Sequence, residues 1–271
     1  MVLNIDRKWC ILLTMGKVLS VVNQKGGVGK TTTVFHLGIA LSKEFKILMV
    51  DLDPQGGLTL MSTGKDPDEY ENTIADVMLE EELEIEEAIL TITKTLSLIP
   101  ANIQLSLVEA LIINAFQREF ILRRNLNKIR DKYDLIIIDT PPSLGLLTIN
   151  ALLASNSIIV PVESRFMGFR GLSILYRLLN KLEKAVEGFS TQNYILGILP
   201  TFHSRTVLSR EIVDEIRDRL KVKIFDPVTE TIRVAETPVF KTPVFEREKE
   251  NPASIAYTKL AEEVKEWLKS S

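Results

Sequence analysis

The stretch NQKGGVGKTTT, residues 23–33, decides the fold of this chain. It follows the apolar run VLSVVN (18–23), which has the β-branched composition of a strand, and leads into TTTVFHLGIALS (31–42), whose apolar residues recur at helical spacing. Glycines between a strand and a helix free backbone N–H groups to turn toward an anion, which the positive end of the helix also attracts. The stretch predicts a phosphate-binding loop of the Gly-x-x-x-x-Gly-Lys-Thr kind, with its first glycine replaced.

The residue types in this loop match the groups that bind a nucleotide and its metal ion. Lys30 would reach the β- and γ-phosphates, and the Thr31 hydroxyl would face Mg²⁺. The residues expected to bind the nucleotide are Lys25, Gly26, Gly27, Val28, Gly29, Lys30, Thr31 and Thr32. The pattern does not need Lys25, and two unpaired ammonium groups so close together would repel each other in a free monomer. A polyanion bound between them would relieve this repulsion.

Apolar runs that alternate with helical patterns set the fold class. The further runs expected to form strands are 46–51, 96–100, 134–139, 157–162, 194–200 and 223–226. Several are apolar on both faces, as buried parallel strands are, and 252–268 has the spacing of a C-terminal helix. We therefore expect a doubly wound, mostly parallel α/β sheet with helices on both faces, forming one domain over 15–271. Residues 1–14 would be an N-terminal extension, either from a start assigned too early or a real appendage.

Composition narrows the cellular setting. The chain has 271 residues, of which 45% are hydrophobic, and its single cysteine, Cys10, excludes a disulfide framework or a cysteine-rich metal site within one chain. No apolar run reaches the roughly 18–20 residues that a membrane span needs, so we expect a cytoplasmic protein. The acidic run 79–88 is expected to be a solvated helix face. Eleven acidic residues and no Lys or Arg lie between Asp66 and Glu87, which leaves +8 on the remaining chain from 33 basic and 25 acidic residues.

Longer motifs resemble one family. KGGVGKTT, with a lysine directly before the glycine pair, is similar to the deviant Walker A motif of the ParA/Soj/MinD class of P-loop ATPases. The resemblance to the ParA/Soj partitioning ATPases covers nearly everything from Met15 onward. It includes MVDLDPQGG (49–57), YDLIIIDTPPSLG (133–145) and TIRVAETP (231–238).

The resemblance implies roles for individual residues. Lys25 would reach into the nucleotide site of the partner subunit, while Lys30 serves its own site, which implies an ATP-dependent homodimer. Both lysines would be catalytic by stabilising charge on the phosphates. Asp53 would be catalytic by helping to position the attacking water, and Asp51 would be structural. Mg²⁺ would be held by Thr31, Asp53 and the Walker B aspartate, Asp139, since this metal prefers oxygen ligands. The reaction would be Mg²⁺-dependent hydrolysis of ATP to ADP and phosphate.

The same resemblance implies partners. The ATP-bound dimer would bind double-stranded DNA without sequence preference, through Arg205 and Arg233, so that the protein associates with the nucleoid. A ParB-like centromere-binding protein would stimulate hydrolysis and release the dimer. The helical pattern over 208–223 mixes arginines with acidic residues, so a monomer should bind DNA weakly. Adenine contacts are expected around 200–203.

Three other functions share the loop. A MinD-like membrane ATPase is the main alternative, but it would need a terminal amphipathic helix with a basic polar face, whereas YTKLAEEVKEWLKSS (257–271) balances its lysines with glutamates. An iron–sulfur carrier would need paired cysteines. A ligase that activates a carboxylate by phosphorylation would need a polar substrate pocket. We expect no membrane partner, and 14 residues are too few for an N-terminal DNA-binding domain.

Overall fold

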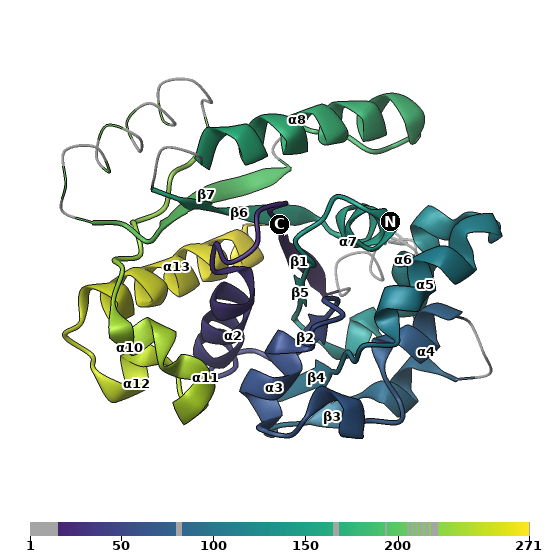
Figure 1. Cartoon of the computed structure of the whole chain (residues 1–271), viewed down its shortest axis with the longest axis horizontal. Helices are drawn as coiled ribbons and strands as arrows, with labels where there is room; N and C mark the ends of the chain where they lie inside the picture. Colours follow the sequence, from purple (N-terminus) through teal and green to yellow (C-terminus); the bar gives the residue numbers. More distant parts are fainter. Residues whose placement is uncertain are drawn as a thin grey trace, which may run out of the picture.

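The computed structural model describes residues 16–79, 83–164, 168–192, 194–204, 206, 209, 211, 214, 217 and 222–270. Within this part of the chain, the strands are β1 (Lys17–Val21), β2 (Ile47–Asp51), β3 (Leu90–Thr91), β4 (Leu96–Ile99), β5 (Leu135–Asp139), β6 (Ser157–Glu163) and β7 (Ile195–Thr201). They form one sheet in the order β3-β4-β2-β5-β1-β6-β7, in which only β3 is antiparallel to its neighbour. The expected doubly wound, mostly parallel α/β fold is confirmed (Figure 1).

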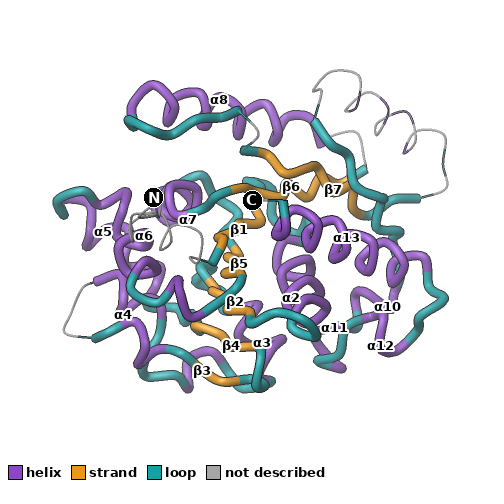
Figure 2. Tube along the Cα trace, turned by 180° about the vertical axis from the view of Figure 1, so that it is seen from behind, coloured by secondary structure: helices purple, strands orange, loops and turns teal. Residues whose placement is uncertain are grey.

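Helices cover both faces of this sheet. The α-helices are α2 (Lys30–Leu41), α3 (Gly57–Thr63), α4 (Ile74–Leu79), α5 (Leu105–Leu111), α6 (Ile121–Asn127), α7 (Leu146–Ala154), α8 (Gly168–Ala185), α10 (Ile232–Ala235), α11 (Thr237–Phe240), α12 (Val244–Arg247) and α13 (Pro252–Lys269). Short 3₁₀ helices are η1 (Pro67–Glu69), η2 (Ile85–Ala88), η3 (Ile112–Asn114), η4 (Arg118–Phe120) and η5 (Arg130–Lys132). Seen from either side, α2 and α13 pack together on one face, and α4–α7 lie on the other (Figure 2).

Alternating side chains of the central strands divide the core in two. On β2, Ile47 and Met49 pack toward α2 and α13, whereas Leu48 and Val50 pack toward α4–α7. A third cluster joins β6 to α8 through Val160, Leu172 and other apolar residues. Because the central strands are buried on both faces, they carry the continuous apolar runs that made them visible in the sequence.

Two expected elements differ from the structure. Residues 223–226 make only an isolated bridge from Ile224 to Ile198 on β7, and the sequence continues with Pro227, which has no N–H for a sheet ladder. The described part of the acidic run 79–88 is no single helix face: α4 ends at Leu79, and Ile85 and Ala88 of η2 are buried. Most of the helix expected over 208–223 lies outside the described residues.

His36 ties the loop-bearing helix to the C-terminal helices. Its Nδ1–H donates to the Thr32 carbonyl at 2.7 Å, so Nε2 accepts the Val244 N–H at 3.1 Å. The ring stacks on Tyr257 of α13, with 4.2 Å between centroids and 13° between planes. Both nitrogens are therefore engaged by the neutral tautomer, and burial lowers the pKa of His36 to about 4.

This burial predicts a pH dependence of stability. The pKa of His36 is lower in the folded chain, about 4, than its ordinary 6.5, so the unfolded state binds more protons between these values. Its contribution, about 3 kcal/mol, should be complete above pH 6.5 and lost as the pH falls toward 4. Burial raises the pKa of Asp51 from 3.8 to about 6, which acts in the opposite direction.

A comparison with His36→Gln isolates the histidine, because Asp51 is the same in both proteins. Urea unfolding at pH 7 and pH 4.5 should show a smaller loss of stability in the variant than in the wild type. Equal losses in the two proteins would contradict the assigned role of His36.

Candidate nucleotide-binding site

The loop between β1 and α2 has the backbone that phosphate binding needs. Gly27 and Gly29 have φ of 72° and 90°, a region that residues with a Cβ rarely adopt. The loop is also tied to the sheet: the Asn23 side chain donates to the Pro161 carbonyl at 2.6 Å, and the Thr201 hydroxyl donates to the Val28 carbonyl at 3.0 Å. These bonds anchor both sides of the loop to the β6–β7 half of the sheet.

Lys30 lies among carboxylates at the base of this loop. Its side chain is buried, and burial lowers the pKa of Lys30, while the nearby carboxylates of Asp139 and Asp53 raise it. The Nζ atom also contacts the Lys25 carbonyl at 3.4 Å. Since parallel strands end at one edge of the sheet, residues from three separate segments meet there.

Asp51 and Asp139 are the last residues of neighbouring strands and face each other in register. Asp51 accepts the N–H and the hydroxyl of Thr59, each at 2.8 Å, and the N–H of Asp53 at 3.2 Å. This pattern supports the structural role expected for Asp51, because its carboxylate organises the loop that carries Asp53.

Asp139 has a different environment. It is fully buried, and neither carboxylate oxygen has a well-formed hydrogen bond within the described residues. Burial and the charge of Asp51 hold the pKa of Asp139 well above its ordinary value, although the nearby Thr31 hydroxyl and Lys30 act in the opposite direction. A buried carboxyl without a well-formed hydrogen bond suits a cation, so Asp139, Thr31 and Asp53 fit a Mg²⁺ ion. No group of three or more His, Cys, Asp or Glu able to hold a metal occurs among the described residues, so phosphate oxygens would have to complete the ligand shell.

Lys25 is paired within its own chain. Its ammonium forms an ion pair with the Glu163 carboxylate at the end of β6. The expectation that both ammonium groups of the loop are unpaired is therefore wrong, since Lys30 also lies among carboxylates. Sequence reasoning missed Glu163 because 138 residues separate it from Lys25.

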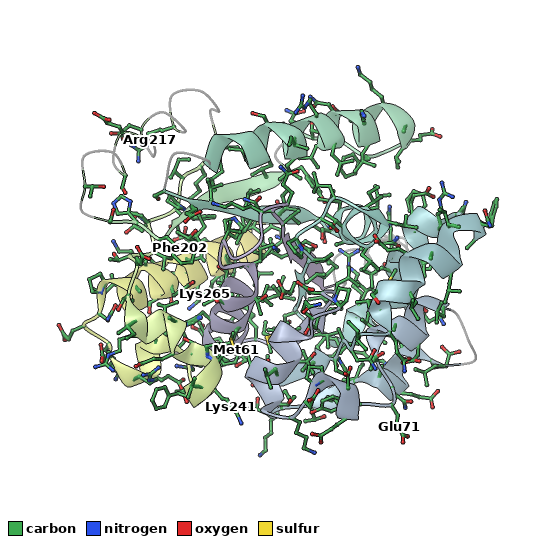
Figure 3. All side chains as sticks on the ribbon, viewed as in Figure 1. Met61, Glu71, Phe202, Arg217, Lys241 and Lys265 are labelled. Carbon is green, nitrogen blue, oxygen red and sulfur yellow. The ribbon has the colours of Figure 1, made fainter. Side chains whose placement is uncertain are left out.

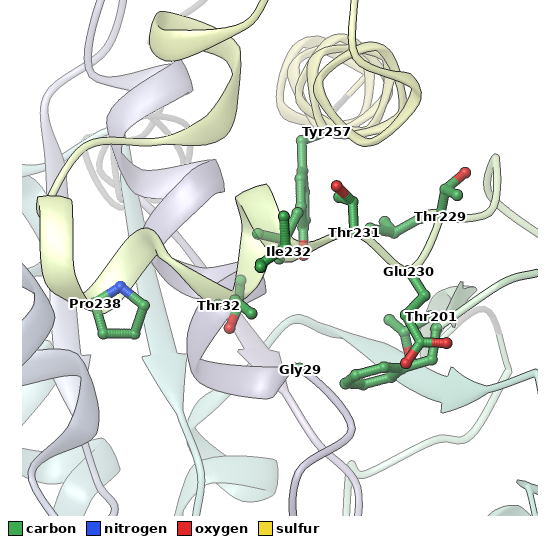
Figure 4. A pocket seen from close by; sticks show the side chains of 13 residues that line it. Gly29, Thr32, Thr201, Thr229, Glu230, Thr231, Ile232, Pro238 and Tyr257 are labelled. Atoms are coloured by element: carbon green, nitrogen blue, oxygen red, sulfur yellow. The ribbon is translucent and has the colours of Figure 1, made fainter.

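A cavity of about 310 Å³ opens beside the loop (Figure 4). Gly29 and Thr32 line it, together with Thr201, Phe202 and Tyr257 of α13. The remaining lining residues are Val228, Thr229, Glu230, Thr231, Ile232, Val234, Ala235 and Pro238. The mostly apolar lining with a few hydroxyls is typical of a site for a flat heterocycle.

Phe202 has an unusual backbone at this cavity. Its φ of 49° is in the left-handed region, where a bulky residue is an outlier. Figure 3 shows it on the segment that follows β7. Of the expected adenine-contact region 200–203, Thr201 and Phe202 line the cavity. The segment 228–235, which supplies more of the wall, was not recognised from sequence.

Of the two arginines expected to bind DNA, the structure describes one. Arg205 lies outside the described residues. Arg233, on α10, is about half exposed and forms ion pairs with Glu236 at 3.4 Å and Glu248 at 2.5 Å. Any anion that binds Arg233 would compete with these two carboxylates.

A strand, glycine loop and helix, with carboxylates at neighbouring strand ends, define the P-loop class of nucleotide-binding proteins. The protein-family model described as "AAA domain" matches residues 16–191. The chain is 37% identical over 253 residues to the sporulation initiation inhibitor protein Soj of Bacillus subtilis, which covers 92% of this chain and 98% of that protein. It is 34% identical over 262 residues to the chromosome partitioning protein ParA of Myxococcus xanthus, covering 96% and 90%. The chain belongs to the ParA/Soj family of P-loop ATPases.

A solved structure is also similar. It is that of cobyrinic acid a,c-diamide synthase from Mycobacterium smegmatis, with a bound ATP analog and magnesium. The identity is 35%, the TM-score is 0.81, and the match covers 94% of this chain and 96% of that one. Among the described helices of this chain, none has the length and apolar content to cross a membrane.

The Asp139 carboxyl is fully buried without a well-formed hydrogen bond within the described residues, so its removal should stabilise the nucleotide-free protein. In Asp139→Asn, the melting temperature without nucleotide or Mg²⁺ should rise by about 2–4 °C for each kcal/mol of desolvation that is recovered. Asp51→Asn is the matched control, because it removes an equally buried carboxylate that has three donors. Thermal unfolding monitored by circular dichroism measures both, and a larger gain for Asp51→Asn would contradict this account.

Proposed function

We propose that this chain is a DNA-partitioning ATPase that alternates between a nucleotide-free monomer and an ATP-bound dimer on DNA. The observation that carries the proposal is the arrangement of Lys30, the two strand-end carboxyl groups of Asp51 and Asp139, and Asp53 in the loop after β2, beneath a glycine loop. The similarity to Soj and ParA over more than 90% of the chain supports the partitioning role.

ATP with Mg²⁺ is the proposed ligand. The phosphates would occupy the loop at 26–32, and the adenine and ribose would enter the cavity between Thr32 and Tyr257. Thr31, Asp53 and Asp139 would hold Mg²⁺, which supplies positive charge to the phosphates when bound. The similarity to the M. smegmatis protein, solved with an ATP analog and magnesium, supports both ligands.

Asp53 is the residue proposed to position the attacking water. It is partly exposed at the start of the loop after β2, and its Oδ1 accepts the nearby Gln55 N–H at 3.0 Å in a turn. An exposed carboxylate beside the γ-phosphate position could hold a water molecule in line. Lys30→Ala should abolish nucleotide binding, whereas Asp53→Ala should retain ATP binding and lose hydrolysis.

Lys25 is proposed to act on the phosphates of the partner subunit. Its ion pair with Glu163 would have to break in both subunits when the dimer forms. The unbound state is therefore stabilised by two intramolecular pairs, each worth about 0.2–1 kcal/mol at a partly exposed position.

Removal of Glu163 should therefore favour the dimer. In an Asp53→Ala background with ATP and Mg²⁺, Glu163→Gln should tighten dimerisation roughly 2- to 30-fold, whereas Lys25→Ala should abolish it. Sedimentation velocity measures the dimer, and Glu44→Gln, which removes the surface pair with Lys265, is the control. If Lys25→Ala dimerises normally with ATP, the proposal of a shared site fails.

DNA binding is proposed to use the surface around Arg233. Each subunit would contribute this arginine, with Arg205, to phosphate contacts, so that affinity should fall steeply with salt. The carboxylates of Glu236 and Glu248 reduce the positive charge of the surface in the nucleotide-free chain.

The test is binding of labelled non-specific duplex DNA by the Asp53→Ala protein with no nucleotide, ADP, or ATP and Mg²⁺, at two salt concentrations. Tight, salt-sensitive binding is expected only with ATP. Arg233→Gln should weaken it without changing dimerisation, and Glu248→Gln, which removes a competing carboxylate, should strengthen it. Normal DNA binding by Arg233→Gln would show that the DNA surface lies elsewhere.

A MinD-like positioning ATPase is the alternative, and the same proteins distinguish it. If no nucleotide state binds DNA, the partitioning proposal fails. The ATP-bound protein would then be tested for sedimentation with anionic lipid vesicles, which the alternative predicts.

A further inference from the structure

Large apolar side chains are exposed along α5 and the turn that follows it. Ile103, Leu107 and Leu111 recur every fourth residue, and their exposed fractions are 51%, 61% and 63%. Ile113 and Phe116 continue the surface, with 52% and 85% exposed. We refer to these five residues as the α5 stripe. Five large apolar side chains exposed within 14 residues are typical of an interaction site.

The fold itself does not need the α5 stripe. Leu105, Val108 and Ile112, on the other side of the same segment, are buried against the core shared with α4 and α7. These residues already anchor the helix. A helix that is apolar on its outer side as well is expected only where that side is covered by something else.

The α5 stripe is connected to the nucleotide site. Glu109 is the only charged residue between 101 and 117, and its Oε1 accepts the N–H of Leu147 in the first turn of α7 at 3.0 Å. A Cβ at Gly145 would lie 2.4 Å from the same oxygen, so α5 and the start of α7 fit closely. The segment that ends at Gly145 begins at Asp139. A molecule bound to α5 would therefore contact a helix that packs directly on the end of the segment 139–145.

The charges beside the α5 stripe define its partner. At the amino end, the Ile103 N–H donates to Asp68 Oδ1 at 3.3 Å. Asp68 belongs to a segment with four exposed carboxylates, Asp66, Asp68, Glu69 and Glu71. At the other end, Glu109 and Glu119 line a cavity of about 370 Å³ with Ile113 and Leu146, where Arg118 is already paired with Glu119. Arg124 also lies at this end, where it donates to the Gln117 carbonyl at 3.2 Å, so positive and negative charges are balanced there. The surface is therefore apolar in the middle and acidic at its amino end, beside Ile103.

This combination excludes several occupants. DNA and anionic lipid would be repelled by the carboxylates beside Ile103. A second copy that used the same face would bring a second acidic segment toward the first. An amphipathic segment with Lys or Arg beside its apolar side chains is complementary both to the apolar residues and to the acidic segment beside Ile103.

We propose that the α5 stripe is the docking surface for a basic amphipathic helix of a partner protein. Binding of this helix would be coupled to the segment 139–145 through Glu109 and α7. The inference extends the proposed function, because it gives a stimulating partner a surface connected to the Walker B segment.

The test uses a fluorescein-labelled 15-residue helical peptide with leucines at every third or fourth position and lysines elsewhere, and an otherwise identical peptide with glutamates. Fluorescence anisotropy without nucleotide compares the wild-type chain with Leu107→Gln/Leu111→Gln. The control is Val239→Gln/Ile255→Gln, which removes exposed apolar side chains (75% and 47% exposed) from α11 and α13.

The lysine peptide should bind the wild type and the control equally, and the α5 double variant about a hundredfold more weakly, at about tenfold for each leucine. The glutamate peptide should bind all three proteins poorly. Equal binding to the double variant, or equal binding of both peptides to the wild type, overturns the proposal. A nucleotide-free dimer that the double variant loses would also overturn it, because a second copy would then occupy the α5 stripe.

Thermal unfolding checks that each variant is folded, and binding of a fluorescent ATP analogue is measured separately. Loss of ATP binding by every protein would refute the proposed function while leaving the peptide result intact. Normal ATP binding with no difference between the proteins in peptide affinity would refute the docking surface alone.

Discussion

The meeting of Asp51 and Asp139 at the ends of neighbouring strands is the constraint on which the site depends. The register that aligns β2 with β5 brings two carboxylates to one buried edge, and the loop after β1 adds Lys30 to the same place. Hydrogen bonds from Thr59 satisfy Asp51, but Asp139 has no comparable donors within the described residues. Keeping the Asp139 carboxyl buried without a well-formed hydrogen bond costs free energy in the empty protein and favours the binding of a cation. Stability and ligand binding are therefore opposed at one residue.

The two lysines of the loop have separate electrostatic environments. Lys30 is buried, and its neighbours are carboxylates that would also serve a metal, so it is bound to its own chain. Lys25 is more exposed and has one carboxylate, from the end of β6. A partner's phosphates would have to displace only one carboxylate to capture Lys25. The different burial of the two lysines, which the sequence alone does not contain, gives a physical basis for assigning them different sites.

The strands of the inner sheet and the phosphate-binding loop were predictable from local sequence. Strands buried on both faces are continuously apolar, and a glycine loop that ends in Lys-Thr between a strand and a helix is a specific signature of phosphate binding. The pairing of Glu163 with Lys25 and the wall formed by 228–235 could not be predicted, because these contacts join segments that are distant in sequence. The two-residue strand β3 is too short to leave a pattern in the sequence. The isolated bridge from Ile224 to β7 shows that an apolar run can pair with a strand at one residue without forming a strand itself. The exposure of Leu107 and Leu111 was equally hidden, since a helical apolar pattern is ordinarily assigned to the core.

Tyr257 has a consequence for synthesis of the protein. It lines the cavity and stacks on His36 of α2, the helix that begins at the phosphate-binding loop. The loop at 26–32 is synthesised early in translation. The side of the cavity that Tyr257 lines forms only after residue 257 has left the ribosome and α13 has packed on α2. During translation the growing chain therefore presents a glycine loop without a complete cavity behind it. Cellular ATP can stabilise the finished fold, but it gives little help to the nascent one.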